Sequence, residues 1–290
     1  MPQIASAESY TPKPTRLHLA LNPDELGQDP LPGLRLANHL GLDGVEIRTC
    51  FGVNALLLPD HRVRELHHMV RDHGLVVAAL ASPLFKWSEG EVSGGVDSFG
   101  FPTSVPRVLR EGHIKRAMEV ARILEAKVVR VFSNLAEKPG GIPFQEDPLL
   151  LFTLRLAREA GVVVAVENEP VCTVCKSGDL LALLSCHGGH GLGLWLDVAN
   201  LFEVGNASME TLAALAPFVR YVHVKDYAGT AAGKRFCPAG SGDVPYSALL
   251  PALFRQCPDV WYTLETHVRD DPTAALQEGT QYLRRLEAVP

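Results

Sequence analysis

The sequence predicts a single-domain α/β protein with the (β/α)8 TIM-barrel fold, and three observations support this fold class. A chain of 290 residues is long for one ordinary core but normal for an eight-stranded barrel. Eight apolar stretches with the length of buried strands alternate with segments of helical periodicity, as expected of βα repeats around a parallel sheet. No strand-to-helix turn carries a G-x-G-x-x-G phosphate fingerprint, so a barrel fits better than a doubly wound sheet.

The first half of the chain contains four of the eight predicted strands. They cover residues 16–21, 44–48, 75–81 and 128–132. Residues 75–81 are continuously apolar, which is expected of a strand that is buried on both faces. Helical periodicity follows in segments that end near residues 40, 73, 126 and 160. This alternation predicts βα units from the start of the barrel onward.

One long connection interrupts this pattern. Residues 85–104 are rich in Gly and Ser and carry Trp87, Phe99 and Phe101. Loops of this length within a compact domain are functional or disordered in most cases. Two roles remain open for the three aromatic side chains: a lid that excludes water from a site, or anchors that pin the loop to the barrel.

Each of the last four predicted strands carries a hard metal ligand near its carboxyl end. The strands cover residues 162–167, 192–197, 220–225 and 260–265, and the ligands are Glu167, Asp197, His223 and Glu265. An ionised carboxylate at the end of a hydrophobic strand is costly unless a partner compensates its charge. Because side chains at the carboxyl ends of barrel strands converge on one face, these four are predicted to meet there. Helices from residue 178 and over 272–286 complete the pattern.

Three carboxylates and one imidazole form an oxygen-rich site. Such a set favours Mn²⁺, Mg²⁺ or Co²⁺, also accommodates Zn²⁺ or Fe²⁺, and differs from a soft thiolate site. Three neighbouring carboxylates without a cation repel one another and raise their pKa values. A divalent ion resolves this repulsion and polarises a substrate carbonyl or hydroxyl as a Lewis acid.

Composition limits the other classes of function. The net charge of -6 gives no general electrostatic footprint for nucleic acid. No apolar run approaches the roughly 18 residues that cross a bilayer, and six cysteines are too sparse for a disulfide scaffold. Residues 1–15 are polar, contain Pro and resemble a flexible arm, which leaves residues 16–290 as the barrel domain. The expected compartment is the cytoplasm.

Five motifs also carry a family resemblance. They are Val164-Ala-Val-Glu-Asn-Glu-Pro170, Leu194-Trp-Leu-Asp-Val-Ala-Asn200, Tyr221-Val-His-Val-Lys-Asp226, Gly240-Ser-Gly-Asp-Val244 and Tyr262-Thr-Leu-Glu265. Together they resemble the xylose isomerase-like TIM-barrel superfamily, and within it most closely the sugar phosphate isomerase/epimerase group. The resemblance runs from about Arg16 to Leu286 and is strongest after Val162.

The resemblance implies one divalent metal ion, Mn²⁺ first, held by Glu167, Asp197, His223 and Glu265. In the epimerases of the family, the two Glu ligands face opposite sides of the substrate carbon, and one removes a proton that the other returns through a metal-stabilised enediolate. A carboxylate beside a metal and a substrate carbon can indeed serve as a general base. The implied activity is a sugar or polyol isomerase or epimerase, with a dehydratase of inosose or dehydroshikimate type as the alternative.

The resemblance also indicates substrate contacts. Asn200 stands where many members have His, and Glu169 replaces the His of an E-N-H-P pattern; both positions touch substrate in the family. Lys225 and Asp226 match its H-x-K-D motif, and Lys225 is expected either to bind substrate oxygens or to form a salt bridge at the barrel rim. Arg235 is expected on a loop before Gly240, in reach of a hydroxyl or carboxylate.

Two further residues have open roles. Glu46, near the end of the second predicted strand, is expected either to contact substrate or to pair with Arg48. His267 lies two residues beyond Glu265 and is expected to support that ligand from behind.

Other functions fit the sequence less well. An endonuclease IV-like repair enzyme needs additional His and Asp ligands, but the third and fourth strands lead into Ala81-Ser82 and Ser133-Asn134. A non-catalytic sugar-binding barrel stays open because of Asn200 and Glu169. Cys172-Thr-Val-Cys175 is a lone CxxC, which we interpret as incidental rather than as half of a zinc site. A homo-oligomer is possible by analogy with the family.

Overall fold

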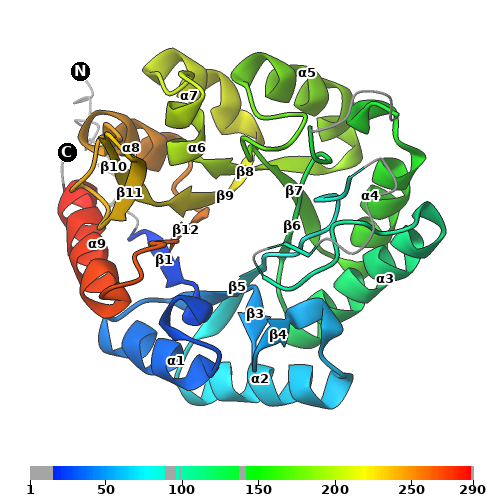
Figure 1. Ribbon diagram of the computed structural model, residues 1–290, viewed down its shortest axis with the longest axis horizontal. Coiled ribbons are helices and arrows are strands. Elements are labelled where there is room, and N and C mark those ends of the chain that lie inside the picture. The colour runs from blue at the N-terminus through cyan, green and yellow to red at the C-terminus, as the bar shows by residue number, and fades with distance from the viewer. Residues whose placement is uncertain (1–15, 89–95, 98, 137–141, 289–290) are drawn as a thin grey trace, which may run out of the picture.

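All eight predicted barrel strands form in the computed structural model, which describes residues 16–88, 96–97, 99–136 and 142–288 (Figure 1). Neighbouring strands are parallel, and they close in the order β1-β12-β9-β8-β7-β6-β5-β2. Their bounds are β1 (His18–Leu21), β2 (Gly44–Ile47), β5 (Val76–Leu80), β6 (Val128–Val131), β7 (Val163–Glu167), β8 (Leu192–Asp197), β9 (Val219–Val224) and β12 (Trp261–Leu264). The predicted (β/α)8 fold is confirmed.

The helices form a ring around the barrel (Figure 1). They are α1 (Pro30–His39), α2 (Asp60–Asp72), α3 (Arg107–Leu124), α4 (Pro148–Ala160), α5 (Ser177–His187), α6 (Val198–Glu203), α7 (Met209–Leu215), α8 (Tyr246–Gln256) and α9 (Pro272–Glu287). Three of them begin in the same way, with an Asp N-cap that accepts a backbone N–H and a Pro at the start of the first turn: α1, α4 and α9. None of the described helices is long and apolar enough to cross a membrane.

Inside the barrel, small residues surround two large aromatic side chains. Ala20 and Ala165 face the same buried cluster as Trp195 and Tyr221, whose rings lie 3.9 Å apart. The Trp195 ring also meets the edge of the His223 imidazole at 5.1 Å. Alternate strand residues point to opposite faces, so the leucines and valines between them pack outward against the helices. The rings of Trp195 and Tyr221 thus pack against His223 inside the barrel.

Two short hairpins extend from the carboxyl ends of the strands. One pairs β3 (Thr49–Cys50) with β4 (Val53–Asn54), and the other pairs β10 (Asp226–Thr230) with β11 (Gly233–Cys237). The expectation of a loop around Arg235 is therefore wrong, because that segment is an antiparallel hairpin. Its sequence has no buried apolar run that would predict a strand, and Gly233 turns the chain with φ of 114°.

The long connection over 85–104 is described in part; residues 89–95 and 98 lie outside the described ranges, as does the predicted arm over 1–15. Trp87 and Phe101 are fully buried. Trp87 packs on Phe85, and Phe101 meets the His113 ring edge-on. These two aromatic side chains are anchors that hold the connection on the barrel.

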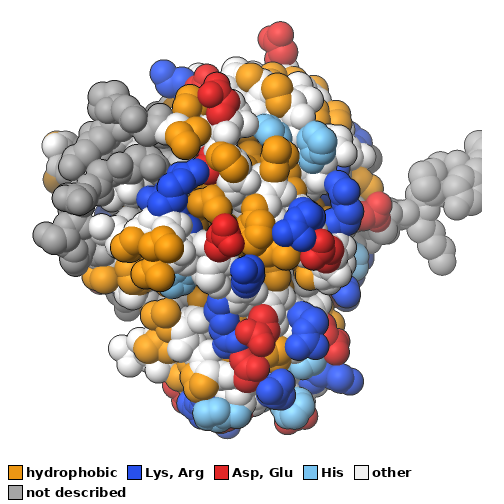
Figure 2. Space-filling view, turned by 90° about the vertical axis from the view of Figure 1, so that its right-hand side faces the viewer, with side chains coloured by type: hydrophobic (Ala, Val, Ile, Leu, Met, Phe, Trp, Pro, Cys, Tyr) orange, Lys and Arg blue, Asp and Glu red, His pale blue; other side chains and the backbone are white. Residues whose placement is uncertain are grey.

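The face of the molecule drawn in Figure 2 carries basic and acidic side chains interspersed with apolar ones. Charges of both signs thus lie near one another on this face. On the exposed surface of α4, Arg155 pairs with Glu159 at 2.7 Å.

Candidate active site

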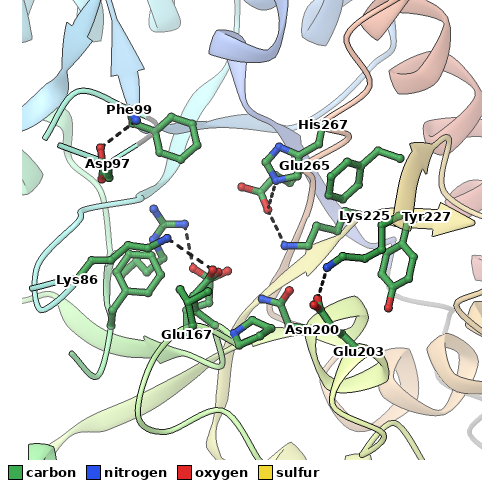
Figure 3. A pocket seen from close by; sticks show the side chains of 17 residues that line it. Lys86, Asp97, Phe99, Glu167, Asn200, Glu203, Lys225, Tyr227, Glu265 and His267 are labelled. Atoms are coloured by element: carbon green, nitrogen blue, oxygen red, sulfur yellow. Dashed lines mark hydrogen bonds and ion pairs between the residues drawn. The ribbon is translucent and has the colours of Figure 1, made fainter. Parts of the chain in front are cut away.

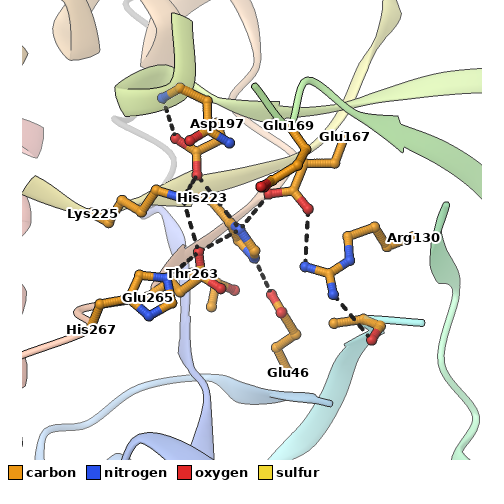
Figure 4. Close-up of polar contacts among 12 residues, drawn as sticks. Glu46, Arg130, Glu167, Glu169, Asp197, His223, Lys225, Thr263, Glu265 and His267 are labelled. Carbon is orange, nitrogen blue, oxygen red and sulfur yellow. Dashed lines mark hydrogen bonds and ion pairs between the residues drawn. The ribbon is translucent and has the colours of Figure 1, made fainter. Parts of the chain in front are cut away.

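Four side chains meet at the carboxyl ends of four adjoining strands. Glu167 ends β7, Asp197 ends β8, His223 lies in β9 and Glu265 directly follows β12. Each offers one potential ligand atom, and these atoms all lie within 4.8 Å of one another (Figure 4). All four residues are buried. The structure thus brings together the four residues that the strand ends predicted as ligands.

The orientation of His223 decides what this cluster can hold. Its Nε2 lies 2.8 Å from the Glu46 Oε2, in hydrogen-bond contact, so Nδ1 is left facing the other three side chains. Nδ1 lies 3.3 Å from Glu265 Oε2, 3.4 Å from Glu167 Oε1 and 4.0 Å from Asp197 Oδ2, without an aligned hydrogen bond. A lone pair aimed at three carboxylates is repulsive unless a cation lies between them. This donor set therefore fits a divalent cation.

Without a cation, a proton compensates the same charge. Burial alone lowers the pKa of His223, but the carboxylates of Glu46 and Glu265, with Glu167 beside them, outweigh it and raise the pKa well above its ordinary value. Burial alone raises the pKa of Glu167, but Arg130 and His223 bring it down to about 2. Both glutamate ligands are ionised at neutral pH, because the pKa of Glu265 is also held well below its ordinary value, against burial, by His223, His267 and Lys225.

A buried arginine side chain binds the outer oxygen of each of the two glutamates. Arg130 Nη1 lies 3.0 Å from Glu167 Oε2, and Arg48 Nη1 lies 2.5 Å from Glu265 Oε1. In both glutamates the other oxygen faces His223. Two arginines from the first half of the chain thus fix Glu167 and Glu265 in the second half.

The roles of these two arginines were not predicted, although the sequence around Arg130 carries a signal. Arg130 interrupts the apolar run Val128-Val-Arg-Val131, where a buried guanidinium requires a carboxylate partner. Arg48 was considered only as a partner of Glu46, and that pairing is wrong. Arg48 binds Asp24, Glu25 and Glu265, whereas Glu46 is fully buried and contacts His223 from below. Glu46 is also not among the residues that line the cavity described below.

Replacing Glu46 with Leu is expected to lower the affinity for a divalent cation about 10- to 100-fold. His223 then loses the acceptor that decides which ring nitrogen faces the three carboxylates. Titration calorimetry with Mn²⁺ measures the change. The matched control is Glu46→Gln, which keeps an acceptor oxygen; wild-type affinity in Glu46→Leu would contradict this role.

A cavity of about 240 Å³ opens above the cluster (Figure 3). Three residues predicted to contact substrate line it: Lys225, Asn200 and Glu169. Lys225 Nζ lies 2.7 Å from Asp197 Oδ2 and 3.4 Å from Glu265 Oε2, so the salt bridge considered for this lysine is present. The Asn200 Nδ2 is buried and has no hydrogen-bond partner. Burial raises the pKa of Glu169, which lies 3.6 Å from Lys86 Nζ.

Four aromatic side chains form part of the remaining wall. Phe99, Phe132, Tyr227 and Phe236 all line the cavity. Phe99 also stacks on Arg48, with its ring centre 3.9 Å from the guanidinium carbon. His267 lies 3.4 Å from Glu265 Oε2, the oxygen that also faces His223, and 4.9 Å from the Phe236 ring. Of the three aromatics in the long connection, Phe99 is thus the one at the site.

Besides Glu46, two predicted substrate contacts do not reach the cavity. The Asp226 carboxylate accepts hydrogen bonds from the backbone N–H groups of four residues: Tyr227, Gly240, Gly242 and Val244. Asp226 therefore holds the 240–244 loop in place. Arg235 is exposed and lies outside the cavity, because alternate residues of β11 face opposite sides and its neighbours Lys234 and Phe236 take the inner one.

The CxxC segment forms no metal site among the described residues. Cys172 and Cys175 are free thiols, and the one group of His, Cys, Asp and Glu side chains able to hold an ion is the cluster of Glu167, Asp197, His223 and Glu265.

Comparison with known proteins agrees with this architecture. A family model described as xylose isomerase-like TIM barrel matches residues 34–286. The uncharacterized protein YihM of Escherichia coli (strain K12) is 32% identical over 100 residues, which cover 33% of this chain and 30% of YihM. The chain thus matches less than a third of the length of that relative.

Several solved structures have the same fold. The probable 3-DHS dehydratase AsbF from Bacillus anthracis superposes with a TM-score of 0.72 at 17% identity, over 92% of this chain and 99% of AsbF. The IOLI protein with a bound zinc atom gives 0.72 at 19%, over 94% and 98%. A D-allulose 3-epimerase from Methylomonas sp. in complex with D-allulose gives 0.69 at 14%, over 93% and 97%. At these identities the structures establish the shared fold.

Proposed function

Because the chain belongs to the xylose isomerase-like TIM-barrel family, we propose that it is a divalent-cation-dependent enzyme that isomerises or epimerises a sugar or polyol. The reaction moves a proton at the carbon next to a carbonyl. The sugar complex of the D-allulose 3-epimerase, which shares the fold, supports this substrate class.

The observation that carries this proposal is the state of the two glutamates. Glu167 and Glu265 both line the cavity and are both ionised, and each has one oxygen fixed by an arginine. A fixed, ionised carboxylate next to a bound substrate carbon is a general base. Having two of them on one cavity allows one to remove a proton and the other to return one.

Glu167, Asp197, His223 and Glu265 are the residues that would hold the cation, with Mn²⁺ as the first expectation. When bound, a divalent ion polarises a substrate carbonyl or hydroxyl as a Lewis acid. Lys225 and Asn200 offer N–H donors to substrate oxygens from the same wall of the cavity. The aromatic side chains exclude water from the proton that moves.

A dehydratase is the second candidate, and Glu169 favours it. This carboxylate lies in the cavity, and burial raises its pKa, so it takes up a proton more readily than an exposed glutamate and can pass that proton to a departing hydroxyl. The probable 3-DHS dehydratase AsbF shares the fold.

One experiment tests both candidates. The cation-loaded protein, with metal content measured by elemental analysis, is incubated in D₂O with a panel of ketoses, aldoses and polyols. An isomerase or epimerase introduces deuterium at the carbon next to the carbonyl, and a dehydratase yields a product lighter by one water. Protein treated with a chelator is the control. A cation-loaded protein that catalyses neither reaction on any panel member would refute the proposal.

A further inference from the structure

The cations that line the cavity already have partners. A phosphate or carboxylate on a substrate is normally bound by Arg or Lys side chains or by backbone N–H groups that are free to receive it. Among the described residues lining the cavity, five side chains can carry positive charge, and each has a carboxylate neighbour. The pairs are Lys86–Glu169 at 3.6 Å, Arg130–Glu167 at 3.0 Å, Lys225–Asp197 at 2.7 Å, Lys234–Glu203 at 2.5 Å and His267–Glu265 at 3.4 Å.

The most exposed of these pairs, Lys234–Glu203, still disfavours the binding of an anion. The Lys234 and Glu203 side chains are 40% and 33% exposed, and such a pair contributes at most about 1 kcal/mol. An anion that took Lys234 would nevertheless lie beside the Glu203 carboxylate.

The usual anion-binding position of a barrel is also filled. In TIM barrels, phosphate groups are frequently bound by the loops after the seventh and eighth strands. Here the seventh barrel strand is β9, and the N–H groups of Gly240, Gly242 and Val244 beyond it all donate to Asp226, at 2.9, 2.9 and 3.2 Å. A Cβ on Gly242 would lie 2.2 Å from Asp226 Oδ1, so the loop is packed tightly around this carboxylate.

In the loop after β12, a backbone N–H likewise donates to a carboxylate of the chain. The backbone N–H of His267 donates to Glu25 Oε2 at 2.8 Å. The arginines Arg235 and Arg269, which have no ion pair in the described part of the chain, line a different cavity on the far side of Phe236 and His267. In these two loops, four backbone N–H groups thus donate to carboxylates of the chain itself.

What remains free in the cavity suits an uncharged ligand. The Asn200 amide is a neutral donor, 3% exposed and without a partner at Nδ2. The rings of Phe99, Phe132, Tyr227 and Phe236 offer apolar surfaces. A polyhydroxylated molecule has hydroxyl groups for the amide and C–H faces for the rings.

From these contacts we infer that the substrate is a sugar or polyol without phosphate or carboxylate groups, and that Asn200 donates a hydrogen bond to one of its hydroxyls. This inference rests on the proposed function and narrows its substrate class. Glu203 then contributes to specificity, because its carboxylate neutralises Lys234, the outermost lysine of the cavity.

Binding measurements separate this inference from the proposed function. The cation-loaded protein is titrated with D-fructose, D-xylulose and myo-inositol, each beside its monophosphate, and with D-gluconate beside sorbitol. The free sugars or polyols are expected to bind at least about tenfold more tightly than their charged counterparts. Such a preference supports the inference even if no turnover occurs. Equal or tighter binding of the phosphates, or binding of no compound, overturns it.

A charge substitution tests the role of Glu203. Glu203→Gln leaves Lys234 without its carboxylate, so the ratio of monophosphate affinity to free-sugar affinity is expected to rise about tenfold. Glu210→Gln, an exposed glutamate on α7, is the matched control and is expected to leave this ratio unchanged. An unchanged ratio in Glu203→Gln contradicts the proposed exclusion by charge.

Discussion

Replacement of Glu265 with Gln is expected to lower kcat by about 10²- to 10⁴-fold and to weaken cation binding by more than the roughly 10- to 100-fold expected for Glu46→Leu. Glutamine keeps the size of the side chain but removes the charge that faces His223 Nδ1 at 3.3 Å and Lys225 Nζ at 3.4 Å. It also removes one of the two carboxylates able to accept a substrate proton. Steady-state kinetics and titration with Mn²⁺ measure the two effects.

The fold is expected to survive this substitution. Arg48, which lies 2.5 Å from Glu265 Oε1, keeps its ion pairs with Asp24 and Glu25. Glu278→Gln, an exposed glutamate on α9, is the control. If Glu265→Gln bound the cation as tightly as the wild type, Glu265 would not be a ligand, and the site would have to be rebuilt from the other three residues.

Replacement of Arg130 with Met is expected to destabilise the cation-free protein by about 3–5 kcal/mol. The change leaves Glu167 buried without its ion pair at 3.0 Å and removes the guanidinium that also donates to the backbone carbonyls of Ala81 and Ser82. Chemical denaturation in the presence of a chelator measures the free energy of unfolding. The control is Arg155→Met on the surface of α4, where loss of an exposed pair costs about 1 kcal/mol or less.

Saturating Mn²⁺ distinguishes a charge effect from a packing effect in Arg130→Met. A cation that binds the folded protein adds stability according to its concentration relative to its Kd, and it also compensates the buried Glu167. Part of the lost stability should therefore return on cation loading. A destabilisation below about 1 kcal/mol in the chelator would show that Glu167 does not depend on Arg130.

The barrel and the four clustered side chains were predictable because they depend on local sequence. A buried parallel strand needs a run of apolar residues, and Glu167, Asp197 and Glu265 each break such a run at its carboxyl end. The closed arrangement of parallel strands then places those ends together without any further information. The ligand cluster follows from the fold alone.

The partners of these residues were not predictable in the same way, because they come from across the barrel. Glu46 and Arg48 are two residues apart and share a strand face, which favours a local pair, yet each bonds to a residue over 170 positions away. A motif can place Asp226 close to the site, but only the structure shows that its carboxylate turns to four backbone N–H groups. Hairpin β10–β11 depends on pairing between segments that are not apolar enough to identify as strands.

The division of the site between the two halves of the chain has a consequence for folding. The four clustered side chains lie on or directly after β7, β8, β9 and β12, which are contiguous in the barrel, whereas Glu46, Arg48 and Arg130 belong to the half formed by β1, β2, β5 and β6. The barrel strands of the two halves pair at the β6–β7 and β1–β12 seams. During synthesis, the half that carries Glu167 and Glu265 emerges last. Both glutamates have formed their ion pairs with Arg130 and Arg48 only when both seams have closed. During refolding, cation affinity is therefore expected to return only when the barrel closes, which is later than the formation of the helices and strands.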